Sequence, residues 1–261
     1  MKRKIVTVCL AAVLVIIAVA GASLAYLTDT DERTNTFTVG DVDITLIEQR
    51  KGANGLESYG EGSYKLKPGK SNDGNAVSKI VTVMNNGTED AYVWVELRIP
   101  AYLVSNEYKV EPHTNESKNA LHWNSYGCFN VEYNSGNYWR LAVSDGIVDA
   151  EHKVTNADMV AVEAGLWYDY EYVGTEDDGN TVVIRTKMKD VLPAGKTSLP
   201  ALAQVYMDWR VTKTADGYKL PDGTEIPKDA SWKIDVRAYA IQADGINGID
   251  AAIAAFADNG K

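Results

Sequence analysis

Short segments in which apolar and polar residues alternate recur along most of this chain. Alternation with a period of two places apolar side chains on one face of a β-strand, and clusters of Gly, Asn, Asp and Ser between the segments are typical of turns. About ten such segments with hardly any helical periodicity predict an all-β fold, an antiparallel jelly-roll-like β-sandwich with long loops. The segments are residues 36–48, 64–66, 76–84, 91–99, 128–133, 138–143, 166–173, 181–188, 202–212 and 231–241.

The clearest predicted hairpin joins residues 76–84 to residues 91–99. The Asn-Asn-Gly sequence at residues 85–87 has the chemistry of a tight turn between two antiparallel strands. One face of residues 91–99 is wholly aliphatic, and we expect the opposite face to be half exposed or covered by a loop. That opposite face carries Tyr92, Trp94, Glu96 and Arg98.

A second hairpin is predicted from the acidic, glycine-containing turn at residues 176–179, which separates residues 166–173 from residues 181–188. Polar stretches between the strands are interpreted as loops, apart from residues 145–164, for which a short helix and a loop both remain open. The predicted loops are residues 51–75, 101–125, 192–200 and 215–230.

The residue pattern at both ends of the predicted sandwich differs from simple alternation. Near the beginning, the apolar parity of residues 36–48 switches at Gly40 and Asp41, which indicates a β-bulge or bend. Near the end, Asp250 can cap a short helix over residues 251–256.

The first residues have the form of an export signal. Three basic residues at positions 2–4 precede an apolar block over residues 5–20, and small side chains follow it. Ser23 and Ala25 fit the two small-residue positions before a cut that would make Tyr26 the first mature residue. Cleavage after Ala22 also fits, and an uncleaved membrane anchor is the alternative. Either way, we expect the body of the protein to lie outside the cytoplasm.

Charge and cysteine content narrow the function classes. The formal net charge is -10, and loss of residues 1–25 removes three positive charges and no negative charge, giving -13. Such a protein repels nucleic acid and anionic lipid. After cleavage only Cys128 remains, so no intramolecular disulfide can form and stability depends on burial and sheet pairing.

Motifs for catalysis or metal binding are absent from the sequence. Glu151 and His152 lack a second histidine at zinc-protease spacing, and His113 and His122 lie nine positions apart in a predicted loop. The G-x-S-x-G and phosphate-binding glycine motifs are missing. Carboxylate pairs at residues 29/31, 41/43 and 177/178 fit solvated turns or edge-strand charges better than metal ligands. The sequence predicts no cofactor and no catalytic residue, which favours a structural protein.

Four segments carry a resemblance to a known family. They are SLAYLTDTDERTNTFTVGDVDITLIE, KIVTVMNNGTEDAYVWVELRIP, LPAGKTSLP and WKIDVRAYAIQADGI. The first is the most specific, because a small-residue cleavage site, an aromatic residue and an N-T-F-T-V-G strand follow one another directly. In these segments the chain resembles the TasA/camelysin (CalY) family of Gram-positive bacteria, which are secreted β-sandwich proteins of biofilm-matrix fibres released by the signal peptidase SipW.

The resemblance implies a secreted, extracellular structural subunit that polymerises with itself, and possible contact with other matrix proteins. It also implies donor-strand assembly, in which the segment freed by cleavage leaves its own subunit and completes a sheet of the next. Thr36, Phe37 and Val39 are the predicted assembly residues. The dedicated signal peptidase is an expected partner during export, and membrane contact is expected only transiently, through the signal segment.

The predicted organisation is a signal peptide (1–25), a donor-strand segment (26–39), a β-sandwich (40–247) and a C-terminal tail with a short helix (248–261). A monomeric surface module that binds carbohydrate or protein is the alternative, through aromatic residues near Trp94 or the loop at His122 and Trp123. Some camelysin relatives are labelled metallopeptidases, but the histidine spacing here does not support that activity.

Overall fold

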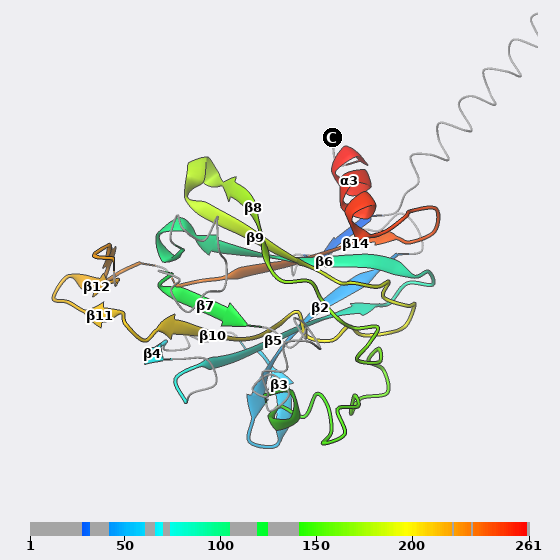
Figure 1. The fold of residues 1–261 in the computed structure, drawn as a ribbon, viewed down its shortest axis with the longest axis horizontal. Helices are drawn as coiled ribbons and strands as arrows, with labels where there is room; N and C mark the ends of the chain where they lie inside the picture. The colour runs from blue at the N-terminus through cyan, green and yellow to red at the C-terminus, as the bar shows by residue number, and fades with distance from the viewer. Residues whose placement is uncertain are drawn as a thin grey trace, which may run out of the picture.

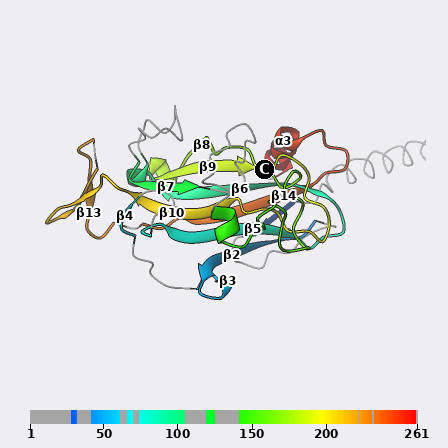
Figure 2. The same ribbon diagram turned by 60° about the horizontal axis from the view of Figure 1, so that its bottom comes forward.

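The structure is a computed structural model that describes residues 28–31, 42–60, 66–69, 74–104, 119–124, 141–220, 222–230 and 232–259. Two β-sheets pack face to face and form a sandwich, and a short helix lies on the outside of one sheet (Figures 1 and 2). The predicted fold class is therefore confirmed. Within the described ranges, no helix is both long and apolar enough to span a membrane.

The first sheet has five strands in a spatial order that differs from the chain order. The order is β1 (Thr28–Asp31), β14 (Asp235–Gln242), β6 (Ala91–Pro100), β9 (Thr181–Lys187) and β8 (Glu171–Glu176). All neighbours in this sheet are antiparallel.

The second sheet is built around β10, which pairs with β5 on one side and β7 on the other. Its members are β3 (Gly55–Ser58), β2 (Ile44–Gly52), β5 (Val77–Asn85), β10 (Leu202–Asp208), β4 (Pro68–Gly69) and β7 (Leu121–Asn124). The chain crosses repeatedly between the two sheets, in the manner of a jelly roll. The strand orders that result are β1-β14-β6-β9 in the first sheet and β5-β10-β7 in the second.

The core lies between the two sheets and is mainly aliphatic. Strands β5 and β6 contribute the most continuous buried runs, including Val81, Val83, Val95 and Leu97, each fully buried. A fully buried aliphatic side chain stabilises a fold by about 1.5–3 kcal/mol. Stability without a disulfide is therefore consistent with the size of this core.

The predicted hairpin of residues 76–84 and 91–99 is wrong, because its two strands belong to different sheets. Strand β5 already pairs with β2 and β10, and β6 pairs with β14 and β9, so neither has a free edge for the other. The turn itself is real: Asn85 accepts a hydrogen bond from the Gly87 N–H and donates to the carbonyl oxygens of Glu89 and Leu192. The Asn-Asn-Gly sequence thus connects the two layers.

The second predicted hairpin is confirmed. Strands β8 and β9 are antiparallel and are joined by a 3-10 turn, η3 (Asp177–Gly179). The first strand is shorter than predicted, since only an isolated bridge between Trp167 and Met188 precedes Glu171.

Several predicted loops contain short strands. A hairpin of β2 and β3 occupies the start of residues 51–75, and residues 215–230 contain β12 (Gly217–Lys219) and β13 (Glu225–Pro227), which form a small sheet with β11 (Thr212–Lys213). Gly217 is required there, because a Cβ atom would lie 2.0 Å from the Ile226 carbonyl oxygen. Polar composition hid these strands, because each is short and most of their residues are exposed, although Ile226 of β13 is buried in the core.

Residues 141–144 form a helical turn, which contradicts the end of the strand predicted for residues 138–143. Residues 145–164 contain turns and isolated bridges, so this stretch is a loop and not the short helix that the sequence also allowed. The predicted strand at residues 128–133, Cys128 and residues 64–65 lie outside the described residues.

The predicted C-terminal helix is confirmed as α3 (Ile249–Asn259), which lies across the outer face of the first sheet (Figure 1). Phe256 packs edge-on against Trp94 and Tyr239, with ring centroids 5.1 and 5.5 Å apart, and those two rings stack on each other. The face around Trp94 is therefore covered by a helix, and Trp94 is only 2% exposed. It does not offer the exposed aromatic surface that the binding-module alternative requires.

Replacing Phe256 with alanine tests whether this aromatic cluster holds α3 on the sheet. Because a half-buried ring is lost, we expect the free energy of unfolding to fall by about 2 kcal/mol and the Trp94 fluorescence to shift to longer wavelength. Phe256→Leu, which keeps much of the apolar volume, should cost about 1 kcal/mol or less. Equal losses for the two variants in urea unfolding would contradict a specific role for the ring.

Candidate functional site

The predicted assembly segment enters the structure at the edge of the first sheet. Strand β1, which lies within residues 26–39, pairs with β14 of its own chain, from Thr28 opposite Ile241 to Asp31 opposite Ala238. The predicted cleavage residues Ser23, Ala25 and Tyr26 lie outside the described residues, as do Thr36, Phe37 and Val39.

In the part of the chain that the structure describes, strand β14 is paired along more of its length on one side than on the other. On one side, eight residue pairs join it to β6 along the whole of Asp235–Gln242, whereas β1 supplies four pairs on the other. Ala238 and Ala240 are fully buried in the core, and Ile241 packs outward with Trp94 against α3. Strand β14 is thus paired with β6 along its whole length, and the shorter β1 pairs with its other edge.

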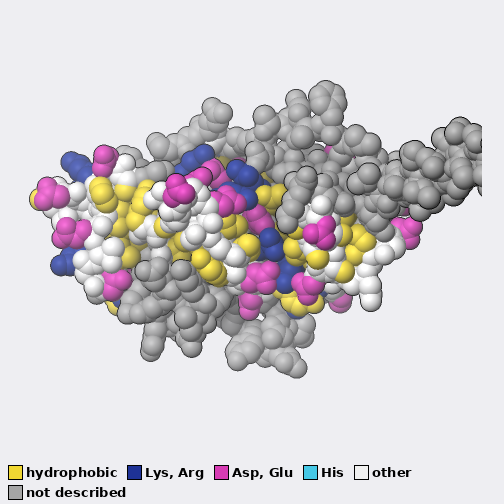
Figure 3. All heavy atoms as spheres, turned by 90° about the horizontal axis from the view of Figure 1, so that it is seen from above, with side chains coloured by type: hydrophobic (Ala, Val, Ile, Leu, Met, Phe, Trp, Pro, Cys, Tyr) yellow, Lys and Arg dark blue, Asp and Glu magenta, His cyan; other side chains and the backbone are white. Residues whose placement is uncertain are grey.

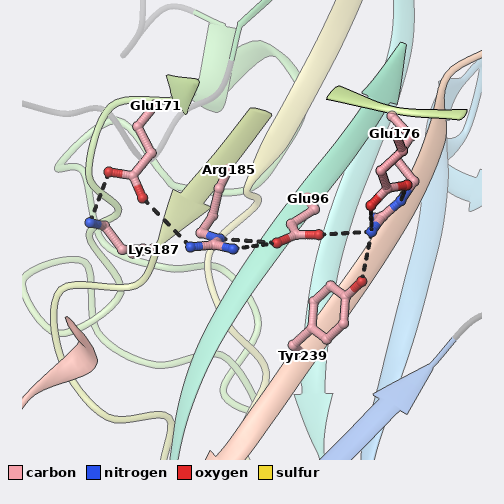
Figure 4. A network of polar contacts seen from close by, with 7 residues as sticks. Glu96, Glu171, Glu176, Arg185, Lys187 and Tyr239 are labelled. Carbon is pink, nitrogen blue, oxygen red and sulfur yellow. Dashed lines mark hydrogen bonds and ion pairs between the residues drawn. The ribbon is translucent and has the colours of Figure 1, made fainter. Parts of the chain in front are cut away.

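Charged side chains form a connected network across the outer face of the first sheet (Figure 4). Glu96 on β6 is at its centre and is 5% exposed. Its Oε1 accepts hydrogen bonds from Nε and Nη2 of Arg185, at 3.0 and 2.7 Å, and its Oε2 lies 3.0 Å from Nη2 of Arg98. One buried carboxylate therefore faces two guanidinium groups.

Arg98 extends the network towards β8 and β14. Its Nε and Nη2 donate to the two carboxylate oxygens of Glu176, at 2.9 and 3.0 Å, and Nη2 also donates to the Tyr239 hydroxyl. Burial alone would lower the pKa of Arg98, but the hydrogen bond to Glu176 and the nearby Tyr239 and Glu96 raise it above its ordinary value. Burial raises the pKa of Tyr239, and the Glu96 charge raises it further. Arg98 is therefore a permanent cation within the sheet face.

The other end of the network ties α3 to the sheet. Nζ of Lys187 lies 3.0 Å from carboxylate oxygens of both Glu171 on β8 and Asp250 on α3. Burial lowers the pKa of Lys187, but these two hydrogen bonds outweigh that effect and raise it. In the space-filling view, acidic and basic side chains are interspersed across the middle of the described surface, with apolar side chains on either side (Figure 3).

The network has the character of a structural element. Every carboxylate in it is neutralised by arginine or lysine, and none of its members is a nucleophile held next to a base. Sequence reasoning missed it, although the signal was present: Glu96 and Arg98 alternate on one strand, and Arg185 and Lys187 alternate on its neighbour.

A second polar cluster lies on the outer face of the second sheet. Asp208, at the end of β10, accepts a hydrogen bond at 2.8 Å from Nη2 of Arg210 and lies 2.8 Å from Nε2 of His122 on β7. The His122 ring also stacks on Tyr206, with centroids 5.2 Å apart. Burial opposes ionisation of Asp208, but the hydrogen bonds from Arg210 and His122 hold the pKa of its carboxyl well below its usual range.

The candidate metal and catalytic residues are not brought together in the described part of the chain. His152 lies in an exposed turn far from the His122 cluster in sequence and topology, and His113 is outside the described residues. No group of three metal-ligating side chains occurs among the residues that the structure describes. Asp177 accepts a hydrogen bond from the Thr181 hydroxyl, as expected of a solvated turn residue.

The loop predicted to bind ligands through His122 and Trp123 is instead a strand with Trp123 turned inward. Trp123 is 3% exposed and packs edge-on against Tyr170 in the core. This aromatic side chain is therefore not available on the surface.

No family model, no curated protein and no solved structure matches this chain. The resemblance to the TasA/camelysin family stays a prediction.

Replacing Glu96 with glutamine tests the centre of the charged network. Two guanidinium groups would then face a neutral amide in a buried position, so we expect the free energy of unfolding to fall by about 3 kcal/mol. Glu171→Gln is the matched control, because Glu171 is 44% exposed and its ion pairs should contribute less than about 1 kcal/mol. Similar losses for both variants in urea unfolding would contradict the central role of Glu96.

Replacing Asp208 with asparagine should lower the free energy of unfolding by about 2–3 kcal/mol at neutral pH, because Arg210 and His122 would then face a neutral amide instead of a carboxylate. Because the pKa of Asp208 is lowered in the folded state, its contribution is fully present above about pH 4, the ordinary pKa of aspartate. It is lost as the pH falls below that value. The stability difference between the two proteins should therefore shrink towards about pH 2; a difference independent of pH would argue against an ionised Asp208.

Proposed function

We propose that this protein is a secreted structural subunit that polymerises into extracellular fibres of a biofilm matrix. Its copies join when the segment after the predicted cleavage site exchanges between subunits. The observation that carries the proposal is the pairing of β1 with β14, because it places part of this segment along an edge of the sandwich. Other matrix proteins and the dedicated signal peptidase are the further proposed partners.

The geometry suits strand exchange for a physical reason. Strand β1 contributes four residues to the sheet, and residues 32–43 connect it to β2 in the other sheet. A strand that pairs through its backbone can be replaced by the same strand of a second copy, which makes equivalent hydrogen bonds and leaves the body of the sandwich unchanged. Exchange in this manner links each copy to the next in one direction and produces an open filament.

The polar clusters support the same proposal from another direction. The charged network and the Asp208 cluster both join strands to one another or to α3. Their charged side chains are paired with one another, so a structural role is sufficient to explain their presence. The acidic net charge suits a protein that remains soluble outside the cell until it assembles.

Electron microscopy of the secreted protein tests the proposal. The chain that begins at Tyr26 should form regular filaments at neutral or mildly acidic pH. A variant that begins at Gly40 should keep the β-sheet circular dichroism spectrum and remain monomeric, because it lacks the exchanged segment. The proposal would be contradicted if the chain that begins at Tyr26 stayed monomeric, or if the chain that begins at Gly40 still formed filaments.

A further inference from the structure

The apolar residues beneath α3 form a cluster that is separate from the core of the sandwich. Its buried members are Trp94, Ile241, Ile249 and Ala252. Side chains alternate between the two faces of a strand, so the neighbouring residues Val93 on β6 and Ala240 on β14 belong to the core between the sheets. The two sheets can therefore keep their core and their pairing when α3 is away.

Few polar contacts join α3 and the residues before it to the sheet. The Tyr92 hydroxyl accepts a hydrogen bond from the Gly248 N–H at 3.0 Å and lies 3.4 Å from the Ile246 carbonyl oxygen. Lys187 pairs with Asp250, whose side chain is 85% exposed, so this ion pair contributes little to stability. In the described part of the chain, one hydroxyl and one exposed ion pair thus hold the helix in addition to its apolar contacts.

The helix is also too short to persist by itself. It has 11 residues, and isolated helices shorter than about 12–15 residues are marginal in water. In the preceding loop, Gly245 and Gly248 have φ values of 74° and 93°, which glycine adopts without the cost that a side chain would bring. When α3 leaves the sheet, we therefore expect the helix to unwind and its loop to be released in one cooperative step.

We propose that residues 244–259 form a strap that opens as one unit while the sandwich stays folded, and that the closed strap stabilises the edge of β14 where β1 pairs. Ala243 is the fixed point of the strap, because its N–H donates to the Asp90 carbonyl oxygen. This device belongs to the single chain and does not depend on assembly into fibres.

The strap and β1 contact the same residues of β14. Tyr239 and Ile241 lie in the cluster under α3, and their backbones pair with Thr30 and Thr28 of β1. The ring of Phe256 packs against that of Tyr239 with an angle of 86° between the ring planes. The closed strap therefore shields this part of the edge, whereas the open strap leaves its backbone hydrogen bonds to compete with water.

Strand β14 itself is expected to stay in place when the strap opens. Its eight residue pairs with β6 lie on the other side, and Ala238 and Ala240 are fully buried in the core. Strand β1 has four residue pairs with β14 in the described part of the chain. Opening of the strap therefore loosens β1 before it loosens β14.

Hydrogen exchange of the monomeric secreted protein, measured by mass spectrometry, tests the strap. We expect the amides of α3 to exchange at least about tenfold faster than those of β6, because a local opening requires less free energy than global unfolding. The amides of β1 should exchange at a rate between these two. Equal rates in α3 and β6 would overturn the inference, because the helix would then open only together with the whole sandwich.

Replacing Ala254 with glycine tests the coupling between α3 and β1. Ala254 is exposed on the helix, so the change lowers helix propensity without removing a buried side chain. It should make α3 exchange about fivefold faster. Exchange of β1 should become faster in parallel, and that of β6 should not change. Ala157→Gly, in an exposed loop, is the matched control and should alter neither α3 nor β1.

The outcomes separate the two parts of the inference. Faster exchange of α3 with unchanged exchange of β1 would overturn the coupling, and unchanged exchange of α3 would overturn the strap. Tyr92→Phe provides an independent measurement, because it removes the hydrogen bond to Gly248 and keeps the aromatic ring. We expect this variant to exchange several-fold faster in both α3 and β1, and a change in neither would contradict the inference.

Discussion

The backbone of β14 needs hydrogen-bond partners on both sides, and the rest of the first sheet depends on how that need is met. Strand β6 supplies one side completely, from Asp235 to Gln242. Among the described residues, four of β1 supply the other side. Unpaired strand edges are costly in an apolar setting and attract other strands in water, so this end of the sheet is where the proposed strand exchange between copies would take place.

The outer face of the same sheet shows how a sandwich can bury charge without a catalytic purpose. Glu96 is almost completely buried, yet it contacts two arginines that come from two different strands. Such pairs barely compensate for the cost of removing ions from water, but a wrong strand order would leave single charges buried. The buried Nη1 of Arg98, which has no partner among the described residues, shows that this cost is not fully offset. We interpret the network as a device that favours one arrangement of β14, β6, β9 and β8 over others.

Alternation of apolar and polar residues was sufficient to predict an all-β sandwich and most of the long strands, and the possible cap at Asp250 predicted the helix at residues 251–256. It could not predict which strands are neighbours. The turn at residues 85–87 indicated a hairpin, although burial of both β5 and β6 on both sides makes each of them a central strand of its own sheet. Pairing between residues as distant as Thr28 and Ile241 leaves no local trace in the sequence. For the same reason, sequence patterns suggested an assembly segment but gave no neighbouring strand for it. Arg98 shares a strand face with Glu96 in the sequence, but Arg185 could be placed beside Glu96 only once β6 and β9 were known to be adjacent.

The chain order of β1 and β14 also has a consequence for the time course of folding. The partner of β1 is the last strand in the described part of the chain, so β1 is synthesised long before β14. Until β14 arrives, β6 also has an open side, and the first sheet cannot be completed. Contacts between such distant parts of a chain form slowly, because a long loop must close first. A newly made chain therefore passes through a period in which neither β1 nor the edge of β14 has its partner, and under the proposed strand exchange this is the period in which β1 pairs with β14 of another copy.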